Sequence, residues 1–357
     1  MKPRVTGMEV LPITVSERTT WRLVRLTTNV GVSGLGEASA GDPEVSDLES
    51  FYGLLGDSLS IQAYRRNGLP RAAAGGVRAA SAFSGIEQAL WDIRGKLLGA
   101  PVHELLGGRV RDAVPLYANV NRMTRNRVPQ GFAESAALAC EAGFQAVKAA
   151  PFDGFPPPDA GRDAIEIATT AGIDAMLAIR AAVGGETAVK VDCHSAFDFS
   201  RAVSVAERLR SVGLDWYEEP LPVDDVEGMR ELRGTVDQRL AGGERRFALD
   251  GFLPLIATGA VDVLMPDITL CGGVLEMLHI ARAAETHGIT ISPHNARGPV
   301  ATAVALSVCA AAANVESLEL QWGEVDWRST LIDPPEQVDG GMLAVHDGPG
   351  FGIELRI

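Results

Sequence analysis

Three acidic residues stand at equal spacing in the middle of the chain, each at the end of a short apolar run. Asp192 lies in KVDCHSAF, Glu218 in DWYEEP and Glu244 in AGGERRF, so 26 residues lead from each to the next. A strand, a helix and the next parallel strand need about that length, which predicts carboxylates at the same end of three parallel strands. Oxygen ligands alone favour Mg²⁺ over zinc. The spacing therefore predicts a magnesium site, although one such acid taken alone would more often be a solvated group.

Two histidines are placed to move protons beside these acids. His194 follows Asp192 by two residues, and the strand period of two puts both side chains on one face. Asp267 ends LMPD and His294 ends ISPH, on the expected sixth and seventh strands. Neighbouring strand ends lie ~5 Å apart, so Asp267 can fix the tautomer of His294 and raise its basicity. The alternatives are a packing role for His194 and a buried structural pair for the other two.

Two further charged residues end predicted strands. Lys148, in AVKAA, ends the second strand, where its ammonium group can meet a substrate carboxylate or extend to solvent. Glu319, in SLEL, ends the eighth strand and is a weaker candidate for the same site.

Strands and helices of a barrel must position all of these residues. Between residues 113 and 324, short β-like runs alternate with helical ones, mostly at intervals of 23 to 29 residues. Eight parallel strands joined by helices predict a TIM barrel, whose active site lies at the carboxyl ends of the strands. The runs end near Asn119, Lys148, Asp192, Glu218, Glu244, Asp267, His294 and Glu319. The one longer interval holds the Pro/Gly-rich residues 151–161, which we expect at the barrel mouth.

Residues 1–112 predict a separate α+β domain. Strands and turns are expected up to residue 60, with a strand at 20–27 and a glycine-rich hairpin at 29–39 that lacks the spacing of a dinucleotide-binding loop. Residues 61–112 are expected to be helical. Ser84 and Glu87 form an S-x-x-E pattern typical of a helix start, and Gly99 predicts the end of that helix. Residues 325–357 are rich in loops, and we expect them to pack on this domain.

Composition limits the kinds of partner. Hydrophobic residues make up 46% of the chain and charged residues 22%, with a net charge of −14 and a pI near 4.9. The acidic balance argues against binding to nucleic acid, and no apolar run approaches the ~18 residues of a membrane span. The four scattered cysteines form no CxxC pair, and the first residues do not read as a signal peptide. We therefore expect a cytoplasmic protein that binds a small molecule.

Together these groups suggest one reaction type. Mg²⁺ held by three carboxylates keeps open positions for a substrate carboxylate, and a base beside it can remove the proton on the α carbon. Loss of a β-hydroxyl group would then complete a dehydration. Return of the proton to the other face would complete a racemisation.

Six segments of the sequence resemble the enolase superfamily, mandelate racemase subgroup: SGIEQALWDIRGKLLGAPVHELLGG, VDCHSAF, WYEEP, GGE, MPD and SPH. The resemblance covers essentially the whole chain. It implies a modified TIM barrel, (β/α)7β, under an α+β capping domain formed by both ends of the chain, and a homo-oligomer. It also implies Asp192, Glu218 and Glu244 as ligands of one Mg²⁺, with Mn²⁺ as a substitute, and His294 with Asp267 as the base.

One departure from the family pattern bears on the reaction. Mandelate racemases, and many dehydratases of the subgroup, carry Lys-x-Lys at the second strand, whereas this chain has Lys148 and Ala150. The second base of a racemase is thus missing, as is the lysine near the sixth strand end of the muconate-lactonising branch. Asp-x-His at 192–194 is similar to dehydratases of the galactonate type, in which the histidine is the general acid. The resemblance favours an acid-sugar dehydratase that makes a 2-keto-3-deoxy acid.

Two alternatives remain open. The chain could be a cycloisomerase or epimerase that uses His294 with Lys148 or a proton from solvent. It could also be a binding protein that retains the metal site without catalysis, although the Asp267/His294 pair argues against that. The substrate itself is expected to be selected by residues 14–20, residues 151–161 and polar residues at the strand ends.

Overall fold

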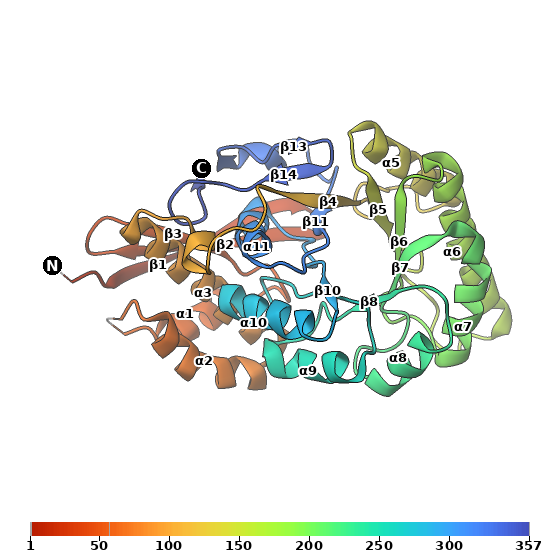
Figure 1. Ribbon diagram of the computed structural model, residues 1–357, viewed down its shortest axis with the longest axis horizontal. Coiled ribbons are helices and arrows are strands. Elements are labelled where there is room, and N and C mark those ends of the chain that lie inside the picture. The colour runs from red at the N-terminus through yellow and green to blue at the C-terminus, as the bar shows by residue number, and fades with distance from the viewer. Residues whose placement is uncertain (1, 57, 357) are drawn as a thin grey trace.

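The structure, a computed structural model that describes residues 2–56 and 58–356, contains the predicted barrel (Figure 1). Its strands are parallel to their barrel neighbours, and β11 pairs with β4. A bridge from Ile291 to Val315 joins the last two strands and closes the ring. The predicted eight strands are confirmed in the described part of the chain: β4 (Ala113–Asn119), β5 (Ala146–Ala149), β6 (Ala188–Asp192), β7 (Leu214–Glu218), β8 (Leu240–Gly242), β9 (Val263–Leu264), β10 (Thr290–Ile291) and β11 (Leu318–Gln321).

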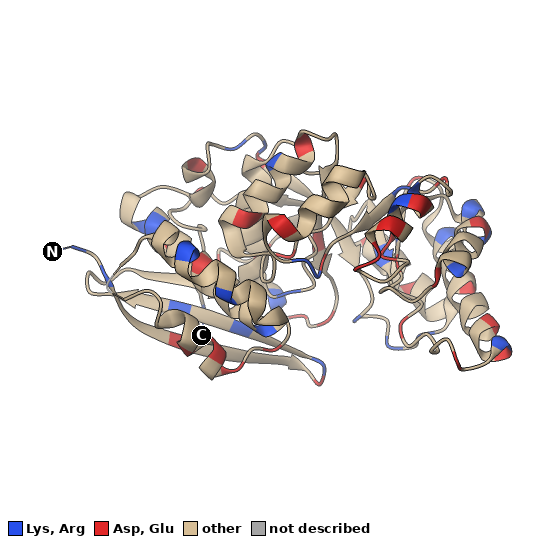
Figure 2. Cartoon of the chain, turned by 90° about the horizontal axis from the view of Figure 1, so that it is seen from below, with Lys and Arg blue, Asp and Glu red and all other residues tan. Residues whose placement is uncertain are grey.

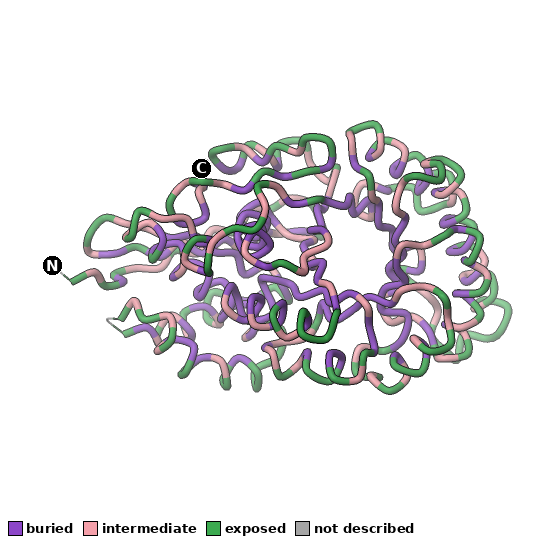
Figure 3. Tube along the Cα trace, in the orientation of Figure 1, coloured by how far each residue is buried: buried purple, intermediate pink, exposed green. Residues whose placement is uncertain are grey.

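Helices between successive strands cover the outside of the barrel. Figure 3 shows their outward sides exposed and the strand ring inside them buried. Aromatic and aliphatic side chains from β4, β7, β8 and β9 fill the barrel interior as one buried cluster. The helices are α5 (Pro129–Glu141), α6 (Arg162–Val183), α7 (Phe199–Arg208) with the short η1 (Arg210–Val212), α8 (Val226–Arg233), α9 (Ala248–Thr258), α10 (Gly273–Glu285) and α11 (Pro299–Ala311).

The N-terminal residues form the expected α+β capping domain. An antiparallel sheet of β1 (Val5–Ser16), β2 (Thr19–Thr28) and β3 (Ser33–Glu37) packs against α3 (Gly76–Leu98). The other helices, α1 (Val45–Tyr52), α2 (Ile61–Ala74) and α4 (Val102–Leu105), also pack on α3. Helix α1 lies where only strands and turns were predicted. Its capping box uses Glu44 and Asp47 instead of a serine or threonine, and Leu48 and Phe51 bury one face of this single short stretch.

Glycines allow β3 to lie directly on α3. A β-carbon at Gly36 would be 2.0 Å from the carbonyl oxygen of Gly85, and one at Gly34 would be 2.2 Å from that of Ala89. No side chain fits between backbones this close. The glycine-rich stretch is therefore the hairpin strand that the sequence predicted, and its glycines serve packing.

The predicted start of the long helix was wrong. Helix α3 begins at Gly76, so Ser84 and Glu87 lie in its middle, while Gly99 ends it in the left-handed conformation as predicted. Ser84 Oγ accepts from the backbone N–H of Gly272 at 3.1 Å, and Glu87 accepts from that of Val274 at 2.8 Å. The S-x-x-E pattern thus caps the barrel helix α10 across the domain interface. The pattern alone does not tell which helix it caps.

A second carboxylate of the capping domain does the same for the next helix. Glu37, at the end of β3, accepts from the backbone N–H groups of Gly298 at 2.8 Å and Ala301 at 3.0 Å, at the start of α11. Both glutamates are fully buried. The capping domain is therefore fixed to the barrel through two helix N-termini, where negative charge is favoured.

The last residues contact both parts of the molecule. β14 (Met342–Ala344) pairs with the first half of β4 and with β13 (Val338–Asp339), beside the barrel in Figure 1. Further on, Val102 N–H donates to Gly350 at 2.8 Å and Phe351 N–H donates to Asp92 at 2.9 Å, so the tail reaches α3 and α4. The remaining short elements are η2 (Arg328–Thr330) and the pair β12 (Ile332–Asp333) and β15 (Glu354–Leu355).

Charged residues of both signs are interspersed over both domains (Figure 2). The four cysteines are free, and three of them are buried. Among the described residues, no helix is both long and apolar enough to cross a membrane.

Candidate active site

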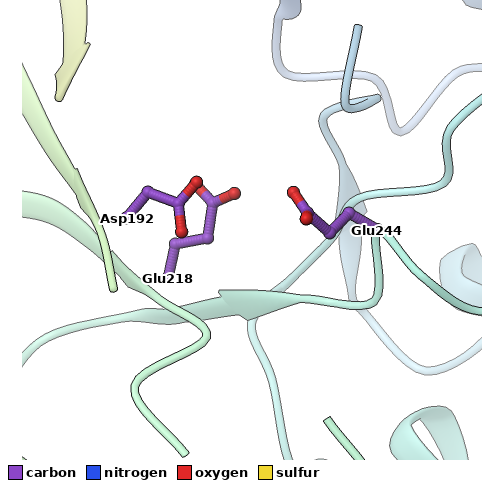
Figure 4. Close-up of side chains that lie close together, drawn as sticks. All are labelled: Asp192, Glu218 and Glu244. Atoms are coloured by element: carbon purple, nitrogen blue, oxygen red, sulfur yellow. The ribbon is translucent and has the colours of Figure 1, made fainter. Parts of the chain in front are cut away.

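The three predicted carboxylates converge at the carboxyl ends of their strands. One oxygen atom from each of Asp192, Glu218 and Glu244 lies within 4.8 Å of the other two, and all three residues are buried. Figure 4 shows the carboxylates of Asp192 and Glu218 together and that of Glu244 pointing toward them from the other side. The first glutamate of WYEEP is the one in this cluster, because Glu219 instead accepts from the backbone N–H of Gly243 at 3.1 Å.

The cluster suits a divalent cation. Burial and the negative charge of Asp192 raise the pKa of Glu218 well above its ordinary value, so a negative charge on Glu218 is disfavoured without a further cation. Glu244 Oε2 is buried, and no described residue forms a hydrogen bond with it. A cation between oxygen ligands would remove the repulsion and give this atom a partner. The donor set fits a hard cation such as Mg²⁺.

Lys148 lies beneath the carboxylates. Its ammonium Nζ is 2.8 Å from Glu218, 3.2 Å from Glu319 and 3.6 Å from Asp192, and its side chain is fully buried. The ammonium group was expected either to extend to solvent or to meet a substrate carboxylate, but it is enclosed by three protein carboxylates instead. The sequence could not show this, because three acids from distant strands surround the lysine.

Glu319 is also fully buried, behind the three carboxylates and next to Lys148. Its carboxylate accepts from Asn119 Nδ2 at 2.6 Å and from the backbone N–H of Asn295 at 2.9 Å, in addition to its contact with Lys148. The oxygen nearest His294 is 3.9 Å from Nε2. Glu319 is therefore near the predicted base without being on the cavity wall.

His294 and Asp267 form the expected contact. Nδ1 of His294 lies 2.9 Å from Asp267 Oδ2, and since a carboxylate only accepts, Nδ1 carries the proton. Nε2 lies 3.3 Å from Glu244 Oε2, an ion-pair distance when the ring is protonated, although the two atoms form no hydrogen bond. Burial by itself lowers the pKa of His294, but the charges of Glu244 and Glu319 and the bond to Asp267 raise that pKa to about 9. A cation on Glu244 would weaken part of this effect.

His194 lies between two carboxylates. Nε2 is 3.0 Å from Asp192 Oδ2, and Nδ1 is 2.5 Å from Asp153 Oδ1. Burial lowers the pKa of His194, but the hydrogen bonds to Asp153 and Asp192 outweigh burial and raise it to about 11. Both ring nitrogens face acceptors, so the ring is held as a proton donor.

The predicted proximity of His194 to Asp192 is confirmed, but the reason differs. Strand β6 ends at Asp192, and His194 and Ser195 adopt left-handed φ angles of 47° and 60°. Such angles are rare outside glycine and collect at functional sites. A turn, rather than strand alternation, folds the imidazole back onto the carboxylate.

Three residues of this region were missed by the sequence analysis. Asp153 belongs to the 151–161 loop, Arg297 donates to Asp267 at 2.8 to 2.9 Å, and Glu324 joins three loops. Only Asp153 had a signal, its place in a loop expected at the mouth. Arg297 follows ISPH by three residues, a spacing that predicts nothing by itself.

The site opens into a cavity of about 850 Å³ at the barrel mouth. Its wall includes Asp192, His194 and His294, the β1–β2 turn, the loop after β4, and Asp153. The segments 14–20 and 151–161 thus both reach the cavity. Its size is that of a small-molecule site.

Two protein families match this chain. Residues 5–107 match the family described as "Mandelate racemase / muconate lactonizing enzyme, N-terminal domain", and residues 131–356 match "Enolase C-terminal domain-like". The fold agrees with a crystal structure of mandelate racemase/muconate lactonizing enzyme from Sulfitobacter sp., with a TM-score of 0.89 and 28% identity over 99% of this chain and 94% of that one.

Curated relatives include sugar-acid dehydratases. D-galactonate dehydratase of Verminephrobacter eiseniae is 32% identical in an alignment that covers 94% of this chain and 89% of the relative. D-gluconate dehydratase of Thermoproteus tenax is 35% identical over 280 residues, or 78% of this chain. The match spans only 55% of that second enzyme.

Proposed function

We propose, because this chain belongs to the enolase superfamily, in the mandelate racemase/muconate lactonizing enzyme subgroup, that it is an Mg²⁺-dependent acid-sugar dehydratase. One observation carries the proposal. His194 lies 3.0 Å from Asp192 and His294 lies 3.3 Å from Glu244, so each imidazole adjoins a different carboxylate of the cluster. A substrate bound at the cluster would meet a histidine on each side, one as base and one as acid.

His294 would remove the α-proton. Asp267 accepts from Nδ1, so Nε2 of the neutral ring would be the atom that takes the α-proton, and His294 lines the cavity. Arg297 and Thr269 also donate to Asp267, so this carboxylate is fixed in place and stays an anion. General bases of this kind contribute roughly 10²- to 10⁴-fold to the rate.

His194 would protonate the departing β-hydroxyl group. Its two nitrogens face Asp153 and Asp192, and a ring held between two acceptors carries a proton on each nitrogen. The hydroxyl would leave as water, and the product would be the enol of a 2-keto-3-deoxy acid. The relatives named above are dehydratases of gluconate and galactonate, which supports this outcome.

Asp192, Glu218 and Glu244 would hold the cation. Mg²⁺, when bound, supplies Lewis-acid stabilisation for the negative charge that develops on the substrate carboxylate. Lys148 and Trp216 donate to the two oxygens of Glu218 at 2.8 and 3.0 Å. We infer that Lys148, supported by Glu319, orients this ligand instead of touching substrate.

Two substitutions test these roles. His294→Asn should abolish exchange of the α-proton in D₂O, because no base remains. His194→Asn should prevent formation of the 2-keto acid while exchange continues. Screening aldonates and aldarates with Mg²⁺, and again with chelator, gives the reference activity, and the exposed His287, changed to Asn, is the matched control. Full dehydration by both variants would refute the assignment.

An epimerase or cycloisomerase is the second candidate. Position 150 carries alanine and Lys148 is enclosed by acids, so the cavity wall offers no lysine as a second base among the described residues. This favours dehydration. NMR of the product separates the two, since only dehydration yields a 2-keto acid. A metal-retaining binding protein would exchange no α-proton with any acid tested.

A further inference from the structure

The mouth of the active-site cavity contains more positive charge than the proposed chemistry uses. Five arginines line it: Arg18, Arg122, Arg125, Arg127 and Arg297. The α-carboxylate of an acid sugar would bind at the metal cluster, whose carboxylates are buried, whereas Arg18 and Arg125 are exposed. A cation elsewhere in the cavity therefore needs a different partner.

Three of these arginines are already neutralised by protein carboxylates. Arg122 pairs with Glu324 and Arg127 pairs with Asp153, each at 3.0 Å. Arg297 pairs with Asp267 at 2.8 Å. These guanidinium groups have structural partners and need none from a ligand.

Arg18 and Arg125 differ from the other three. Both are exposed, and within residues 2–56 and 58–356 neither guanidinium group makes a hydrogen bond or ion pair. Glu17, which also lines the mouth, is exposed and makes no ion pair with any described residue. Two arginines against one glutamate leave a net positive charge at the open end of the cavity.

A buried carboxylate fixes the segments that carry these two arginines. Glu324, whose side chain is only 6% exposed, accepts from Ser16 Oγ at 3.0 Å and Thr19 Oγ1 at 2.6 Å, on either side of Arg18. Its other oxygen accepts from Arg122 at 3.0 Å, three residues before Arg125. One carboxylate thus ties the β1–β2 turn and the loop after β4 to the same point. Such support lowers the entropic cost of binding a ligand between them.

We propose that Arg18 and Arg125 form a subsite for a second anionic group of the substrate, on the exposed side of the cavity. The inference rests on the proposed function and narrows its substrate class to doubly charged sugar acids. Guanidinium groups bind carboxylates and phosphates alike, so the second anion is the terminal carboxylate of an aldarate or the phosphate of a phosphorylated aldonate. Singly charged aldonates would leave the subsite empty.

Paired substrates test this directly. Each aldonate is compared with the aldarate and the terminally phosphorylated aldonate of the same configuration at carbons 2 and 3, by kcat/KM with Mg²⁺. A preference of at least tenfold for a doubly charged acid is expected, and which one is preferred identifies the second anion. The preference should fall as salt increases, because the two arginines are exposed.

Variants connect that preference to the two residues. Arg125→Met and Arg18→Met should each lower the ratio of kcat/KM for the doubly charged acid over the aldonate about tenfold, mainly through KM. Arg125→Lys should retain most of the ratio, and Arg125→Glu should lower it further. Arg94→Met, at an exposed arginine on α3, is the matched control and should leave the ratio unchanged.

The outcomes separate the subsite from the reaction. Formation of a 2-keto acid from any acid tested sustains the proposed function, and its absence with all acids overturns that function first. If exchange occurs but aldonates are turned over as well as doubly charged acids, the subsite is refuted. It is equally refuted if the ratio survives both methionine substitutions in variants whose thermal unfolding matches that of the wild type.

Discussion

Two groups of buried carboxylates differ in what surrounds them. Glu37 and Glu87, between the domains, each accept from backbone N–H groups at the start of a barrel helix. Asp192, Glu218 and Glu244, at the barrel mouth, face one another, and Glu244 Oε2 has no hydrogen-bond partner in the described part of the chain. Both groups are almost completely buried.

The difference shows what identifies a functional acid. Burial alone does not distinguish the two groups, because a buried carboxylate can be stabilised either by a helix N-terminus or by a bound cation. The interface carboxylates are satisfied by the protein, so they stabilise the fold. Among the site carboxylates, Asp192 and Glu218 have cationic partners, but Glu244 Oε2 has no hydrogen-bond partner in the described part of the chain, and this oxygen is available to a metal ion.

Removing one site carboxylate should produce the largest functional change. Glu244→Gln should lower kcat/KM more than ~100-fold, because removing a metal ligand costs more than removing a residue that hydrogen-bonds to a ligand. The metal-free protein should keep its stability or gain some, since repulsion is relieved. Titration calorimetry with Mg²⁺ and thermal unfolding in chelator measure both, with Glu285→Gln on α10 as the surface control. A strong loss of metal-free stability would place Glu244 with the interface carboxylates.

Removing an interface carboxylate should have the opposite profile. Glu87→Ala should lower the free energy of unfolding by ~3–5 kcal/mol, because Arg65, 3.6 Å away, would lose a buried partner and α10 its cap. Metal affinity of the folded protein should change little. Urea unfolding in chelator, with Glu285→Ala for comparison, measures the loss. An unchanged midpoint would show that the interface does not depend on this contact.

The free energy of unfolding should depend on pH through the same residue, Glu87. Burial raises the pKa of Glu87 to about 7, despite the lowering effect of Arg65. A carboxyl group whose pKa is higher in the folded than in the unfolded protein stabilises the fold while it is protonated. For Glu87 this stabilisation is lost as pH rises from about 4.5, the pKa in the unfolded chain, through about 7, the pKa in the folded protein. Glu87→Gln should therefore gain relative to wild type between pH 5 and 8, by up to ~3 kcal/mol. A constant difference across this range would contradict the raised pKa.

The smallest effect concerns the cation itself. Mg²⁺ at 100 times its Kd should stabilise the wild type by ~2.7 kcal/mol, because it binds only the folded site. Glu87→Gln should show the same increment, and Glu244→Gln should show none. Thermal shift with and without Mg²⁺ measures it. A cation effect that survives Glu244→Gln would place the ion elsewhere.

The barrel and the three acids could be predicted because the spacing of strand ends is set by the length of a crossover helix. Position along a strand then placed Asp192, Glu218, Asp267 and His294 at one end of the barrel. The contact between Asp267 and His294 followed from neighbouring strands. None of these inferences needed a loop conformation.

Other features depended on the assembled fold. The environment of Lys148 is made by three strands, and the left-handed turn at His194 has no glycine to announce it. Ser84 and Glu87 had the right pattern for a cap, but the backbone N–H that Ser84 accepts from, that of Gly272, lies 188 residues later in the sequence. The roles of the site residues, the domain boundaries and the homo-oligomer remain predictions.

The contact of the tail with α3 also bears on how the protein is made. Asp92 receives the backbone N–H of Phe351, which lies 259 residues later in the sequence. At ~5–20 residues per second, a ribosome needs roughly 13–50 s to synthesise that interval. During this time the nascent capping domain lacks the segment that packs on its central helix. All eight barrel strands are therefore synthesised before the capping domain can be completed.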